Sequence, residues 1–114
     1  YRFFFFFSHS DQRLLGYAAC RILADHLYVD DFLIDADAAE MHANFWRALA
    51  RAAYREGHAA LTLQFLGGTA HRRAIAAAGL VTRDTCPVLA CASSQFPGGL
   101  AAINWYLTEA DFDT

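Results

Sequence analysis

The stretch from Leu27 to Gly57 constrains the fold of this chain more than any other. It opens with nine mostly apolar residues, Leu27 to Asp35, which are typical of a strand. After a tight turn, Asp37 and Glu40 stand at the spacing of a capping box, in which carboxylates accept hydrogen bonds from the free N–H groups of a helix start. We therefore predict a helix from this box to just before Gly57, which favours a helix end.

The other elements are apolar runs separated by Gly, Pro and polar turn residues. We predict a second helix from Thr69 to Ala78, and strands at Tyr1 to Phe7, Leu14 to Leu23, Ala59 to Leu66, Cys86 to Ala92 and Ile103 to Thr108. The first two strands form an antiparallel hairpin, and long crossovers imply parallel pairing of the third, fourth and fifth strands. The fold class is α/β in the α+β sense: a mixed, partly antiparallel central sheet flanked by two helices, in the order β-β-β-α-β-α-β-β.

Composition narrows the function classes. The 114 residues are 56% hydrophobic and 18% charged, which suits a single domain, 1–114, with its own core. The net charge of −3 argues against nucleic acid as a partner, and no apolar run approaches the ~20 residues that a membrane-spanning helix needs. The three Cys have no paired short spacing, which favours reduced thiols and a cytoplasmic location. The five His show no metal-ligand spacing, so we expect no metal.

Three segments carry a family resemblance when taken in order: Val29 to Asp35, Ala74 to Val81 and Asn104 to Asp111. Together they resemble the central strand, the end of the second helix and the last strand in the C-terminal two-thirds of the GNAT acyltransferase fold. The resemblance implies transfer of an acyl group from acetyl-CoA or another acyl-CoA to an amine acceptor. It also implies that the family's first strand and first two helices lie upstream of Tyr1.

Two positions depart from the family pattern. The turn from Ala36 to Glu40 lacks the Gly and Arg of the family's phosphate loop, and the carboxylates of Asp37 and Glu40 would repel an anion. Ile75 stands where the family often has a Tyr that serves as general acid. We therefore expect a degenerate domain with weak or absent binding of CoA.

The resemblance assigns candidate site residues. Backbone groups of Phe32, Leu33 and Ile34 would hold the thioester and its oxyanion. Asp31 is the candidate general base, because Asp30 and Asp31 face opposite sides of a strand and only one of them can point at a cleft. The alternative is that one of these carboxylates faces solvent and the other hydrogen-bonds a turn.

Two further readings stay open. Arg72 and Arg73 at the start of the second helix are candidates for a CoA phosphate, or they form a surface pair. The chain as a whole can instead be a non-catalytic structural or dimerisation module of a larger protein, with a homodimer or a companion domain as partner. The aromatic run from Phe3 to Phe7 favours this alternative, because an apolar edge strand readily pairs with another strand.

Overall fold

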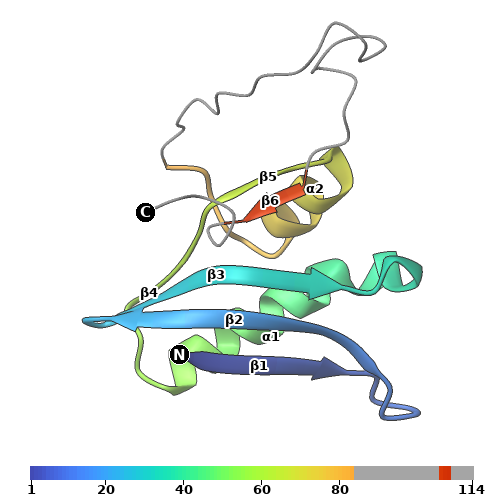
Figure 1. Ribbon diagram of the computed structural model, residues 1–114, viewed down its shortest axis with the longest axis horizontal. Helices are drawn as coiled ribbons and strands as arrows, with labels where there is room; N and C mark the ends of the chain where they lie inside the picture. Colours follow the sequence, from blue (N-terminus) through green and yellow to red (C-terminus); the bar gives the residue numbers. More distant parts are fainter. Residues whose placement is uncertain (84–105, 109–114) are drawn as a thin grey trace, which may run out of the picture.

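The main body of the fold is a four-stranded mixed sheet with a helix on one face (Figure 1). The structure is a computed structural model that describes residues 1–83 and 106–108, without the side chains of three alanines at 36, 38 and 39. The strand order is β1 (Arg2–Phe7), β2 (Leu14–Leu23), β3 (His26–Ile34) and β4 (Ala60–Leu63). The β1–β2 and β2–β3 pairs are antiparallel, and β3–β4 is parallel, so the predicted mixed sheet is confirmed.

The chain crosses from β3 to β4 through helices. A 3₁₀ helix, η1 (Ala36–Met41), leads into α1 (His42–Arg55), and a second α-helix, α2 (Thr69–Ala77), follows later. Both α-helices end just before a glycine. Gly57 has a φ of 85° and Gly79 a φ of 98°, a left-handed conformation that residues with side chains disfavour. At each end the next residue donates its N–H to a carbonyl five residues back, His58 to Ala53 and Leu80 to Ile75.

The predicted strand from Ala59 to Leu66 is two strands in the structure. After β4, the chain breaks at Gln64 and continues as β5 (Phe65–Gly67), which pairs antiparallel with β6 (Tyr106–Thr108) in a separate two-stranded sheet. This small sheet lies beside β3 together with α2 (Figure 1). The predicted strand from Cys86 to Ala92, and the start of the one from Ile103, lie outside the described residues.

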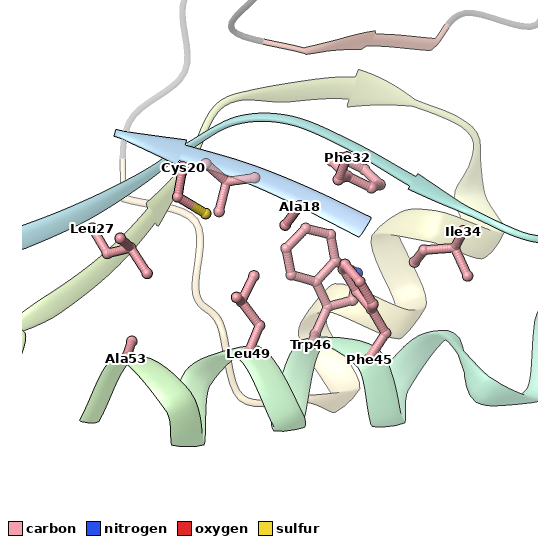
Figure 2. Packing of buried hydrophobic residues seen from close by; sticks show 10 residues of the cluster. Ala18, Cys20, Leu27, Phe32, Ile34, Phe45, Trp46, Leu49 and Ala53 are labelled. Carbon is pink, nitrogen blue, oxygen red and sulfur yellow. The ribbon is translucent and has the colours of Figure 1, made fainter. Parts of the chain in front are cut away.

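The core lies between the main sheet and α1 (Figure 2). Trp46 and Phe32 are its largest fully buried side chains, and their rings meet edge to face at 4.7 Å between centroids. Other buried side chains come from alternate positions of β2 and β3 and from one face of α1: Ala18, Cys20, Leu27, Val29, Ile34, Phe45, Leu49 and Ala53. α2 adds partly buried residues to this core, among them Ile75.

A β-bulge interrupts the β2–β3 pairing in the middle of β3. Ala19 pairs with Asp31 whereas Cys20 pairs with Val29, so Asp30 is the extra residue on β3. The bulge changes the alternation of side chains, and Val29 and Phe32 are both buried against α1 although they are three residues apart. It therefore divides β3 into two halves with different surroundings.

Candidate functional site

The candidate site is the second half of β3, where the parallel ladder with β4 has ended. The β3–β4 pairing runs only from His26–Ala60 to Val29–Leu63. Beyond Val29, the described residues on this side of β3 belong to β5, β6 and α2 rather than to a paired strand. The backbone edge from the bulge to Ile34 must therefore find other hydrogen-bond partners.

Asp31 is held by two hydroxyl groups from other strands. The Tyr17 hydroxyl donates to Oδ2 at 2.8 Å, and the Thr108 hydroxyl donates to Oδ1 at 3.2 Å. The hydrogen bond to Asp31 is the main reason why the pKa of Tyr17 is raised. Asp31 thus joins β2, β3 and β6 at one half-buried point, and both of its carboxylate oxygens are engaged.

The Asp30 carboxylate has a different environment and a different partner. Its carboxylate is buried and lies 3.2 Å from Nη2 of Arg21, whose guanidinium also lies over the Tyr28 ring at 5.6 Å from the centroid. Within residues 1–83 and 106–108, neither Asp30 nor Asp31 hydrogen-bonds a turn, and this part of the chain does not support that alternative. The expectation that the two carboxylates face opposite sides of β3 is wrong. Their partners Arg21 and Tyr17 lie four residues apart on one face of β2, and the bulge turns Asp30 and Asp31 to that same face.

The three predicted thioester-binding residues do not form an open groove. The Phe32 carbonyl oxygen accepts a hydrogen bond from the Tyr106 hydroxyl, and the side chains of Phe32 and Ile34 are buried. The Leu33 side chain points the other way and is 56% exposed. The structure therefore brings Asp31 and Phe32 close to β6, but it already uses the backbone acceptor of Phe32.

An aromatic cluster fills the space between β3, the small sheet and α2. The Phe32 ring contacts Phe65, Tyr106 and His71, with centroid distances of 5.2, 5.4 and 6.2 Å. Phe65 and Tyr106 also meet edge to face at 5.4 Å. These side chains therefore fill the space beside the second half of β3, where a ligand would need a cleft.

Two histidines stack at the margin of this cluster. His42 of α1 and His71 of α2 lie 5.0 Å apart with nearly parallel rings, and His42 is buried. Nε2 of His42 and Nδ1 of His71 are buried without a hydrogen-bond partner among the described residues. Burial, and then the proximity of His42, lower the pKa of His71. Burial of the His71 ring therefore favours its neutral form.

The predicted capping box is wrong. No side-chain hydrogen bond caps α1, and the residue before its first turn is Met41. Asp35 holds the turn instead: one carboxylate oxygen accepts the Asp37 N–H at 2.9 Å, and the other pairs with Arg13 at 2.9 Å. The reason is the 3₁₀ helix η1, which shifts the start of α1 away from Asp37 and leaves the side chains of Asp37 and Glu40 exposed.

A cavity of about 420 Å³ lies between η1 and the β1–β2 loop. Asp37 and Glu40 line one side, and His9 and Arg13 line the other. Neither Asp31 nor Phe32 lines it. Arg72 and Arg73 are exposed on α2 and have no side-chain partner within residues 1–83 and 106–108, which fits the surface alternative as well as a phosphate contact.

Tyr17, Tyr106, Thr108 and the two stacked histidines are site residues that sequence reasoning missed. Their contacts join positions between 14 and 77 residues apart, and no local motif marks them. Comparisons with protein-family models, curated proteins and solved structures found no match for this chain. Within the described ranges, no helix is long and apolar enough to cross a bilayer, and no group of three or more His, Cys, Asp and Glu is arranged to hold a metal ion.

Proposed function

We propose that this chain is a GNAT-type N-acyltransferase-like domain that binds acyl-CoA weakly or not at all. The order of its elements supports the family part of the proposal, because an antiparallel β1–β2–β3 unit is followed by α1 and a parallel β4. The observation that carries the degenerate part is the Tyr106 hydroxyl on the Phe32 carbonyl, inside the aromatic cluster beside β3.

A thioester needs an edge of backbone and room for its acyl group. The resemblance assigns both to Phe32, Leu33 and Ile34. Here the Phe32 carbonyl already has a donor, and the rings of Phe65 and Tyr106 lie within 5.4 Å of the Phe32 ring. A bound acyl group would have to displace these aromatic contacts, which costs on the order of 1 kcal/mol for each pair beyond the area they bury.

The phosphate end of the cofactor meets a second obstacle. The exposed carboxylates of Asp37 and Glu40 face the place where the family's loop would bind pyrophosphate, and Asp35 already accepts the Asp37 N–H. Arg72 and Arg73 are the cations that would have to compensate. They lie on α2, where both side chains are exposed.

Asp31 is poorly prepared to act as a base. Accepting a proton from an amine would remove the charge that strengthens the hydrogen bonds from Tyr17 and Thr108, which join three strands. If the domain is active, Asp31 remains the candidate base and an amine remains the acceptor. A cytoplasmic location belongs to the same proposal and is supported by the free, buried thiol of Cys20.

Isothermal titration with acetyl-CoA tests this function. We expect no saturable heat up to about 1 mM, which corresponds to less than ~4 kcal/mol of binding free energy. Micromolar binding would contradict the degenerate assignment. The Tyr106→Ala variant removes the donor and the ring from the Phe32 edge, with Tyr54→Ala as the control because Tyr54 is 83% exposed. Gain of acetyl-CoA binding in Tyr106→Ala alone would identify Tyr106 as the closing residue.

A further inference from the structure

α2 and the small sheet form a unit that is lightly attached to the main body. β5 and β6 pair with each other and with no other strand of the described chain. The His71 ring of α2 lies 5.7 Å from the Phe65 ring and 5.5 Å from the Tyr106 ring, so the three elements pack on one another. No residue of α2 is fully buried, and the chain passes from β4 into this unit at Gln64 (Figure 1). The unit can therefore separate from the main sheet as one body.

Polar contacts hold this unit to the main body on two sides. Two hydroxyl groups of β6 donate to β3. On the other side, Nη2 of Arg47 in α1 donates to the Ala77 carbonyl of α2 at 3.1 Å. The rings of His42 and His71 stack between the same two helices, 5.0 Å apart. Among these contacts, the histidine pair is the one whose charge changes between pH 5 and 8.

The histidine pair has no acceptor for an added proton. Nε2 of His42 and Nδ1 of His71 are buried without a hydrogen-bond partner in the described part of the chain. In a neutral imidazole such a nitrogen can be the bare one, but protonation converts it into an N–H donor that lacks an acceptor. By contrast, a ring nitrogen of His26 and one of His58 each lie within 3.5 Å of a carboxylate oxygen. Protonation is therefore compensated at those two rings and not at the stacked pair.

The other groups around His71 do not offset its charge. Those on the elements packed against it are an imidazole, a phenol and the cations of both helices: His42, Tyr106, Arg47, Arg72 and Arg73. Asp31 is the nearby carboxylate of β3, and both of its oxygens already accept hydroxyl groups. Burial, and then the proximity of His42, lower the pKa of His71, so this ring binds a proton more readily once it is exposed.

We propose that the stacked pair of His42 and His71 is an acid-sensitive latch between α1 and α2. Protonation of His71 places a charge without an acceptor between the helices and releases α2, β5 and β6 together from the main body. Release withdraws the Tyr106 hydroxyl from the Phe32 carbonyl and uncovers the second half of β3. The inference rests on the contact between the two helices and does not depend on the acyltransferase proposal.

Hydrogen exchange of the backbone amides, observed by NMR on the full chain at about pH 7.5 and about pH 5.5, tests the latch. Exchange rates are converted to protection factors, which remove the intrinsic pH dependence of exchange. At the higher pH, we expect the α2 amides to be at least about tenfold less protected than the ladder amides of β2 and β3, because the unit opens without global unfolding. At the lower pH, their protection should fall by a further factor of about three to ten, since an exposed histidine titrates near pH 6.5.

Two substitutions separate the proton from the packing. His71→Phe and His71→Gln are both uncharged over this pH range, but one side chain is apolar and the other is polar. Both should reduce the pH response of the α2 amides to less than about twofold. His26→Gln is the matched control, because His26 is also half-buried but its Nδ1 lies 2.8 Å from a carboxylate oxygen of Asp25. This variant should keep the response of the wild type.

Three results would overturn the proposal. Equal protection of α2 and the β2–β3 ladder would show that the unit does not open by itself. A pH response that persists in both His71 variants, or that is lost in His26→Gln, would assign it to other groups. The imidazole signal of His71 in the native chain should titrate below about pH 6.5, and titration at or above that pH would remove the driving force for release.

Discussion

The two halves of β3 belong to the same strand but have opposite surroundings. From His26 to Val29 the strand is paired on both sides, with β2 and with β4. From Asp31 to Ile34 it is paired with β2 alone, and the other edge is met by the Tyr106 hydroxyl and an aromatic cluster. The bulge at Asp30 separates the halves. The first half is therefore part of the scaffold. The second half has the strand-free backbone edge that a ligand requires, but side chains already fill the space beside it.

Truncation of Phe32 should have the largest effect on stability. Phe32 is 1% exposed and contacts Trp46, Phe65 and Tyr106, so Phe32→Ala should lower the free energy of unfolding by about 3–5 kcal/mol. Val29→Ala in the first half removes fewer atoms and should cost about 2 kcal/mol. Urea denaturation measures both. Equal costs would remove the distinction between the halves.

The two adjacent aspartates sharpen the comparison. Asp31→Ala should cost about 1–3 kcal/mol, because it leaves the Tyr17 and Thr108 hydroxyl groups without their acceptor. Asp30→Ala should cost less, about 1 kcal/mol or below, because the Arg21 side chain is 44% exposed and can turn to water. Asp31→Asn keeps an acceptor and should fall between these values. A larger loss in Asp30→Ala than in Asp31→Ala, measured by thermal unfolding, would contradict this assignment.

Acidification should lower the free energy of unfolding through His71, which lies at the edge of the aromatic cluster beside the second half of β3. The pKa of His71 is lowered in the folded state by burial and by His42, so the unfolded chain binds more protons as the pH falls below about 6.5. The contribution of neutral His71 to the free energy of unfolding should therefore be fully present above that pH and decrease toward pH 5. His71→Phe should flatten this part of the profile, whereas His9→Gln, at an exposed loop position, should not. Identical profiles for the wild type and His71→Phe would exclude the stacked pair as the cause.

The smallest effect concerns Cys20, whose partner in the β2–β3 ladder is Val29 of the first half. Cys20 is fully buried, and burial is the main reason why its pKa is raised to about 12. In a Cys86→Ser, Cys91→Ser background, iodoacetamide at pH 8 should label the native chain far more slowly than the urea-unfolded chain. Rapid labelling of the native chain would show that the β2–β3 scaffold opens easily.

Local patterns predicted most of the elements, and long-range packing decided the rest. The two hairpin strands, α1 and the glycines that end both helices follow from apolar periodicity and turn residues. Helical spacing also predicts a buried stripe of Met41, Phe45, Leu49 and Ala52; Phe45 and Leu49 are buried, but Trp46 is the most buried residue of α1. A stripe of that width includes positions on either side of a strict four-residue repeat.

The site was predicted only in outline. The sequence pattern singled out Asp31 and Phe32, which both lie in it, but it could not show that Tyr17, Tyr106 and Thr108 would meet them from other strands. The bulge at Asp30 also depends on the β2–β3 register, which no single strand encodes. The capping box failed because Asp35 competes for the same turn and a 3₁₀ helix precedes α1.

The central claim is that the second half of β3 is closed to an acyl thioester. Titration of the ¹⁵N-labelled chain with acetyl-CoA, observed at the backbone amides of Asp31, Phe32, Leu33 and Ile34, tests it most directly. The account predicts no saturable shift of these four signals at ligand concentrations up to about 1 mM. Saturable shifts centred on them at micromolar ligand would contradict it and would show that Tyr106 and the aromatic cluster give way to the cofactor.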